Sequence, residues 1–202
     1  MKEIKQRLEE VKSQIKETAD KVGRHPSEIK LVAVSKTRDI NEIEEVIEEN
    51  LINLGEIRVQ ELRDKYDNFD QSIKWHMIGH LQRNKVKYLS RMENCELIHS
   101  LDSLRLAKKI NKRAKMENRK MKVLVQVNTA KDENKYGLNP KELIDYLTKI
   151  SSYSYIEVKG LMTIAPYTDD PEEVRPYFAK LRELSEKVKE QRVDELLDLV
   201  NL

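Results

Sequence analysis

The chain repeats one pattern of apolar and polar positions six times. A short, mostly apolar segment comes first, and a longer segment follows in which apolar residues recur every three or four positions. Apolar runs are typical of strands covered on both faces, and the second spacing is typical of helices with one buried face. The predicted strands are residues 29–36, 51–56, 73–79, 95–102, 122–129 and 156–164.

A helix is predicted after every strand, and one more precedes the first strand. Asp39 with Glu42 matches a capping box, and Asn139 with Pro140 marks another helix start. The predicted helices cover residues 4–22, 40–50, 58–69, 81–92, 103–118, a segment from 139 onward and 171–191. Apolar residues within 193–200 extend the helical spacing of the last one.

Six strands that alternate with helices over short connections predict an α/β fold with a parallel sheet in one domain, residues 1–202. The sheet is either open and doubly wound or closed as a (β/α)8 barrel. A barrel runs to roughly 250 residues, about 30 for each unit. Only about six units are visible here, so the periodicity alone favours the open sheet.

Composition narrows the class of protein. The 38 Lys and Arg residues nearly balance the 36 Asp and Glu residues, and a net charge of +2 gives no case for nucleic acid as a partner. Cys95 is the single cysteine, which excludes an internal disulfide and a cysteine metal site; we expect it in the core. No segment approaches the ~20 apolar residues of a membrane span, so we expect a cytoplasmic protein without a membrane partner.

We expect the functional site at the carboxyl ends of the strands, where doubly wound sheets and barrels both bind ligands. Lys36 ends the first predicted strand. At the mouth of an apolar pocket a lysine loses solvation, and its neutral amine becomes able to attack a carbonyl group. The alternative is that Lys36 reaches solvent or pairs with Glu56, and spacing alone does not decide between them.

Two other signals give no case for a metal site or for a nucleic-acid interface. His76 and His80 are four residues apart, but they lie in a strand that enters a loop, where this spacing does not direct both rings to one metal ion. We therefore expect a packed His76, a loop His80 and no metal site. The basic segment 103–120 has no interleaved aromatic residues, which favours a solvated helix face.

An ordered series of motifs carries a family resemblance. It includes "LVAVSKT", "GEIRVQEL", "WHMIGHLQRNKVK", "VLVQVN" and "GLMTIAPYTDDPEEVRPYF". Together they closely resemble the YggS/PROSC-type pyridoxal phosphate homeostasis proteins. The resemblance implies an alanine racemase-like TIM barrel, a (β/α)8 fold, that binds pyridoxal 5′-phosphate (PLP) and helps to control free PLP in the cell without established catalysis.

The resemblance also implies a set of cofactor-binding residues. Lys36 stands where the family holds PLP as a Schiff base, and a reversible imine stores this reactive aldehyde without destroying it. Ile57 replaces the asparagine of the family's "GEN" motif and offers packing without a side-chain hydrogen bond. His80, Asn128 and Met162 are placed near the pocket because they lie at strand ends. No catalytic residue and no metal ligand is implied.

Family members continue beyond the last motif with two more strands, which contribute the phosphate site. This sequence ends in "DELLDLVNL" instead, so we expect the first and sixth strands to be unpaired edges. Two alternatives to a carrier remain: a PLP-dependent, racemase-like enzyme, and a PLP-free scaffold without a phosphate site. We expect a monomer, with PLP-dependent apoenzymes as candidate partners.

Overall fold

Six parallel strands form one sheet in the computed structural model, which describes residues 2–130, 132 and 135–190. The strands are β1 (Ala33–Val34), β2 (Asn53–Glu56), β3 (Lys74–Met77), β4 (Cys95–Leu101), β5 (Met121–Gln126) and β6 (Ile156–Met162). Their order in the sheet is their order in the chain. A doubly wound sheet reverses its order at a switch point, whereas a barrel adds each strand beside the last. The order is therefore that of a partial barrel, and the preference for an open doubly wound sheet is wrong.

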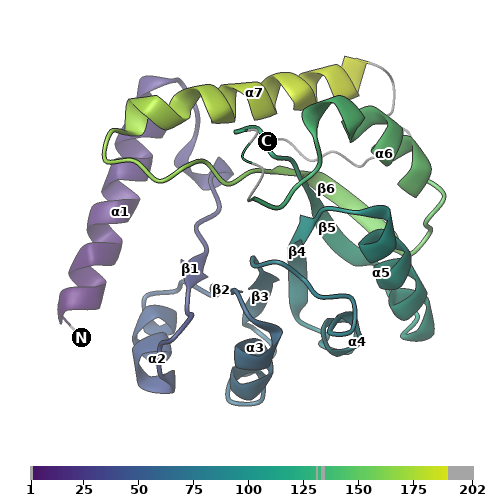
Figure 1. Ribbon diagram of the computed structural model, residues 1–202. Helices are drawn as coiled ribbons and strands as arrows, with labels where there is room; N and C mark the ends of the chain where they lie inside the picture. Colours follow the sequence, from purple (N-terminus) through teal and green to yellow (C-terminus); the bar gives the residue numbers. More distant parts are fainter. Residues whose placement is uncertain (1, 131, 133–134, 191–202) are drawn as a thin grey trace.

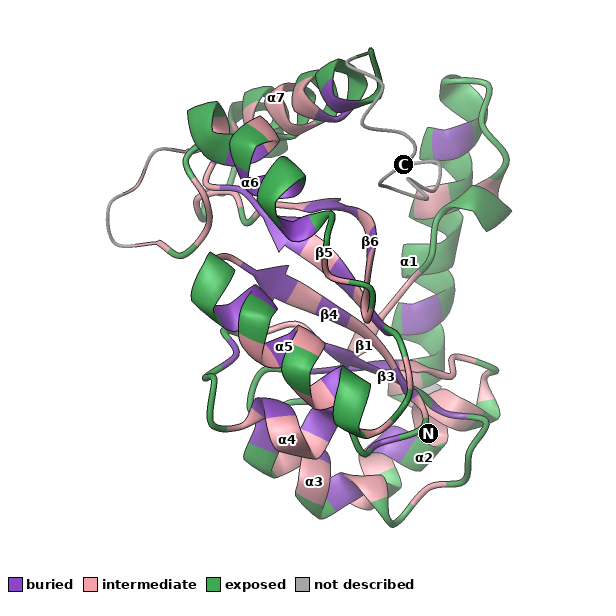
Figure 2. Ribbon diagram, turned by 90° about the vertical axis from the view of Figure 1, so that its right-hand side faces the viewer, coloured by how far each residue is buried: buried purple, intermediate pink, exposed green. Residues whose placement is uncertain are grey.

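Helices surround the sheet on its outer side (Figure 1). They are α1 (Lys2–Lys21), α2 (Ile40–Glu48), α3 (Val59–Tyr66), α4 (Val86–Leu89), α5 (Leu104–Met116), α6 (Leu143–Ile150) and α7 (Pro171–Glu190), with short 3-10 turns η1 (Pro26–Glu28) and η2 (Pro140–Glu142). The capping box of Asp39 and Glu42 is present at the start of α2. Figure 2 shows buried residues along the strands and on the helix faces turned toward them.

Two predicted elements are much shorter in the structure. The strand predicted at 29–36 pairs only over Ala33–Val34, because β1 has a described neighbour on one side alone. The helix predicted at 81–92 is reduced to α4, because the chain first makes a turn in which the Lys85 N–H donates to the Gln82 carbonyl. The apolar segment 193–200 lies outside the described residues.

The main core lies between the outer face of the sheet and the helices. Trp75, Met77 and Ile98 are fully buried there, with Leu62 of α3 among their neighbours in the core. Cys95 is buried as expected, and burial raises the pKa of its thiol to about 12. No described helix is long and apolar enough to span a bilayer.

The inner face of the sheet holds a pair of histidines. Nδ1 of His76 is 2.9 Å from Nε2 of His99, and Nε2 of His76 is 3.1 Å from Oδ1 of Asn53. An amide oxygen only accepts, so His76 donates to Asn53 and accepts from His99. The prediction of a packed His76 is confirmed. Burial, followed by the neighbouring cation Lys30, lowers the pKa of His99 to about 4; for His76, burial and then His99 lower the pKa to the same value.

These pKa values predict that the protein loses stability in mild acid. An unfolded histidine takes up a proton near pH 6.5, whereas the folded pair stays neutral to about pH 4. The unfolded state therefore binds more protons as the pH falls from 6.5 toward 4. The free energy of unfolding should decrease by up to about 1.4 kcal/mol per pH unit for each histidine.

Urea unfolding at pH 7.5 and pH 5 measures this loss. His99→Gln should reduce the pH dependence, because it removes one of the two buried histidines. An equal pH dependence in His99→Gln and in the wild type would contradict the assignment.

Candidate functional site

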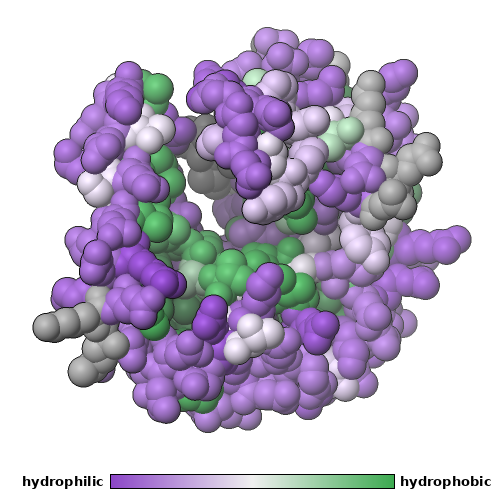
Figure 3. Space-filling view, turned by 60° about the vertical axis from the view of Figure 1, so that its left-hand side comes forward, coloured by the Kyte–Doolittle hydropathy of each residue, from purple (hydrophilic) through white to green (hydrophobic). Residues whose placement is uncertain are grey.

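The predicted site residues lie along one edge of the sheet, because parallel strands all end on the same side. Lys36, Ile57, His80 and Asn128 each follow a strand by one to three residues, and Met162 ends β6. Figure 3 shows a hollow with an apolar floor on the face of the molecule that includes α1 and β1. Apolar surface is also exposed at both edges of the sheet: Val34 in β1 is 47% exposed, and Ile164 after β6 is 55% exposed.

Lys36 is exposed, and its amine has no hydrogen bond or ion pair to any described residue. The prediction of a lysine desolvated in an apolar pocket therefore differs from the structure. The reason is that β1 is an edge strand, which leaves the residue after it uncovered on one side. The alternative in which Lys36 pairs with Glu56 is wrong, since Glu56 is paired with another lysine.

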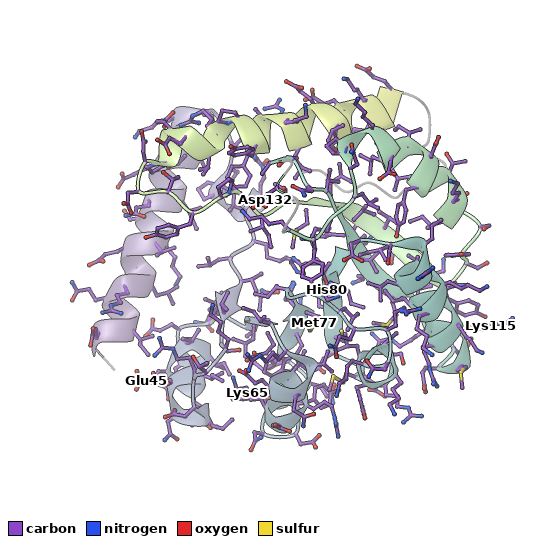
Figure 4. All side chains as sticks on the ribbon, in the orientation of Figure 1. Glu45, Lys65, Met77, His80, Lys115 and Asp132 are labelled. Atoms are coloured by element: carbon purple, nitrogen blue, oxygen red, sulfur yellow. The ribbon has the colours of Figure 1, made fainter. Side chains whose placement is uncertain are left out.

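That other lysine is Lys65, which extends from α3 to the end of β1 (Figure 4). Its Nζ lies 2.7 Å from Glu56 Oε1 and donates to the Ser35 carbonyl at 2.6 Å. The Ser35 hydroxyl donates to the same Glu56 oxygen at 2.7 Å. All three residues are buried. The contact joins the last residue of β2 and the residue after β1 to α3.

Sequence analysis missed Lys65, although a signal was present. Lys65 follows Val59 and Leu62 at three-residue spacing, on the buried face of α3. A lysine in an apolar helical face is almost never buried without a partner. That position indicates a carboxylate partner, and Glu56 is nine residues earlier in the chain.

The ion pair predicts a matched set of stability effects. Lys65→Met leaves the Glu56 carboxylate buried and unpaired, and should lower the free energy of unfolding by about 3–5 kcal/mol. The double variant Lys65→Met, Glu56→Leu replaces both charges with apolar groups and should recover most of this loss. Chemical unfolding of both variants measures the difference. A double variant no more stable than the single one would contradict a paired arrangement.

Ile57 lies against Gly79 at the ends of β2 and β3. A Cβ atom on Gly79 would lie 2.8 Å from the Ile57 Cα atom and 2.7 Å from its Cγ2 atom, and closer still to its carbonyl oxygen. Glycine is therefore required for this close approach. Ile57 is 37% exposed and adds apolar surface at the edge of the sheet.

This contact predicts that Gly79→Ala lowers the free energy of unfolding by about 1–3 kcal/mol through overpacking. The main obstacle is backbone, so the loss should persist when Ile57→Ala removes the side-chain part of the clash. Thermal or chemical unfolding of the two single variants and the double variant checks this. Full rescue by Ile57→Ala would show that the side chain alone was responsible.

His80 is held by two partners at the end of β3. Its Nδ1 lies 3.2 Å from Asp102 Oδ2, and its ring stacks on Tyr136 with centroids 3.8 Å apart and planes 12° apart. Sequence analysis did not single out Tyr136, because its place in a loop between β5 and η2 carries no periodic signal. His76 instead contacts His99, so the two histidines of the "WHMIGH" segment have separate partners.

Met162 contacts the residue that precedes Asn128 rather than Asn128 itself. Val127 N–H donates to the Met162 carbonyl at 2.8 Å. The Asn128 side chain is used within its own loop: its amide nitrogen donates to the Asp132 carbonyl at 2.7 Å, and its oxygen accepts from the Asp132 N–H. Asn128 thus shapes the loop that presents Tyr136. No described contact joins these residues to Lys36.

A groove of about 1000 Å³ extends outward from this edge, between residues 80–84 and α5. Its cations are Arg83, Arg105, Lys108, Lys109 and Lys112. Within the described part of the chain they form no ion pairs, and Asp102 is the one carboxylate in the lining. A cationic groove raises the local concentration of anions. Among the described residues, no cluster of three or more potential metal ligands occurs.

Comparison with known proteins agrees with this geometry. Residues 7–201 match the family described as alanine racemase, N-terminal domain, which defines the class of this domain. An alanine racemase from Clostridium difficile has the same fold, with a TM-score of 0.69 and 20% identity over 82% of this chain and 46% of that one.

Proteins with higher sequence identity narrow the domain class to one family. The chain is 43% identical to the pyridoxal phosphate homeostasis protein of Aquifex aeolicus, over 92% of this chain and 81% of that one. PipY of Synechococcus elongatus is 30% identical, with a TM-score of 0.80 without PLP and 0.75 with PLP bound, over 93% of this chain and 86% of that one. The chain belongs to the pyridoxal phosphate homeostasis protein family, which confirms the resemblance drawn from its motifs.

Proposed function

We propose that this protein binds PLP through Lys36 and helps to control free PLP in the cell, without turning over a substrate of its own. The observation that carries the proposal is the Lys36 amine, which is exposed at the carboxyl end of β1 and has no partner among the described residues. The homeostasis proteins of the same family and the PLP-bound structure of PipY support it.

The residues at this edge fit the aldehyde end of the cofactor. PLP supplies a reactive aldehyde when bound. Lys36 supplies a primary amine that condenses with the aldehyde: a C=N bond forms, water leaves, and the reaction reverses when water adds again. Ile57 provides apolar surface nearby. His80, Asn128 and Met162 remain candidate contacts for the rest of the cofactor.

Storage and transfer rather than turnover are favoured by what surrounds Lys36. A racemase requires a second group that moves a proton on the opposite side of the substrate. In the described part of the chain, no acid or base contacts the Lys36 amine. The proposal places the protein in the cytoplasm as a monomer that passes PLP to PLP-dependent apoenzymes.

Trapping with borohydride tests the proposal. The purified chain is mixed with PLP and reduced, and the modified peptides are mapped by mass spectrometry. We expect one pyridoxyl group per chain on Lys36, lost in Lys36→Ala and retained in Lys115→Ala, at an exposed lysine on α5 outside the cationic groove. Labelling spread evenly over surface lysines would contradict the proposal. Exchange of amino-acid α-protons in deuterated water, if it depended on Lys36, would favour the racemase alternative.

A further inference from the structure

Helix α3 holds the backbone on both sides of Lys36. On one side Lys65 Nζ donates to the Ser35 carbonyl at 2.6 Å. On the other side the Thr37 N–H donates to Glu61 Oε2 at 3.0 Å. Glu61 and Lys65 are one helical turn apart, and their charged atoms lie 3.9 Å from each other. The two peptide groups that flank Lys36 are therefore bound by neighbouring side chains of one helix.

The segment around Lys36 requires such support because few backbone contacts of its own hold it in place. β1 pairs over two residues, and no described strand adjoins its outer edge. Thr37 has a φ of 60°, a left-handed conformation that is unfavourable for a β-branched residue. Backbone in such a conformation persists only where the surrounding contacts fix it. The hydrogen bond from Thr37 to Glu61 is one of those contacts.

We propose that Glu61 is a positioning residue for Lys36. It binds the Thr37 N–H and holds the turn in the conformation from which the Lys36 amine projects at the edge of the sheet. Lys65 secures the preceding carbonyl, and its buried pairing with Glu56 anchors the arrangement to β2. A group held in place before its ligand arrives loses less freedom on binding. The inference rests on the proposed function, because it concerns the same lysine.

Glu61 is well suited to a test because its buried partner Lys65 keeps the closer ion pair with Glu56 when Glu61 is removed. Glu61→Ala removes the acceptor, Glu61→Gln keeps an acceptor oxygen, and Asp64→Ala is a control on the exposed face of the same helix. The first measurement is hydrogen exchange of the Thr37 amide in the PLP-free protein. We expect exchange about tenfold faster in Glu61→Ala, and close to the wild type in the other two variants.

The second measurement is the rate at which PLP becomes trappable on Lys36, followed by borohydride reduction and peptide mapping. Glu61→Ala should be about tenfold slower, with recovery in Glu61→Gln. Equal rates in Glu61→Ala and the wild type would overturn the inference, as would a Glu61→Gln variant as slow as Glu61→Ala. No label on Lys36 in the wild type would instead overturn the proposed function, so the two failures are distinguishable.

Discussion

The buried contact among Lys65, Glu56 and Ser35 is the interaction on which the candidate site depends. It joins three elements, α3, β2 and the end of β1, at one point. Its contribution to stability is expected to be small, because taking both charges out of water offsets most of their attraction. Glu56 Oε2 even lacks a hydrogen-bond partner among the described residues. The value of the contact is geometric, since it fixes where β1 ends and therefore where Lys36 begins.

That geometric role matters more at the edge of a sheet than in its centre. A central strand such as β4 is held by neighbours on both sides, so its ends are fixed by ladder hydrogen bonds. β1 and β6 are the two outer strands of the described sheet, as the sequence predicted. For β1, contacts from α3 substitute for part of what a second neighbouring strand would supply. The reactive lysine candidate therefore depends on side chains from a helix that begins 23 residues later.

Much of the fold could be predicted from the sequence because local patterns of apolar and polar residues determine it. The strands β3, β4 and β6 lie within their predicted ranges, β5 begins one residue before its predicted range, and the caps at Asp39 and Asn139 occur as expected. The errors fall where tertiary context overrides the pattern: β1 is short because it is an edge, and α4 is short because a turn precedes it. Strand order was not accessible from periodicity, since an open sheet and a barrel share the same alternation. The resemblance of the motifs to a known family indicated the strand order of a barrel.

The site was predictable in position but not in its contacts. The rule that ligands bind at the carboxyl ends of parallel strands located Lys36 from its place in the chain alone. The partners Lys65, Glu61 and Tyr136 were not found, because each reaches the edge across a tertiary contact. The contacts of Lys65 and Glu61 constrain the backbone around Lys36, and among the described residues none engages its amine. A fixed backbone with an uncommitted amine suits reversible capture of an aldehyde, which is the chemistry on which the proposed function depends.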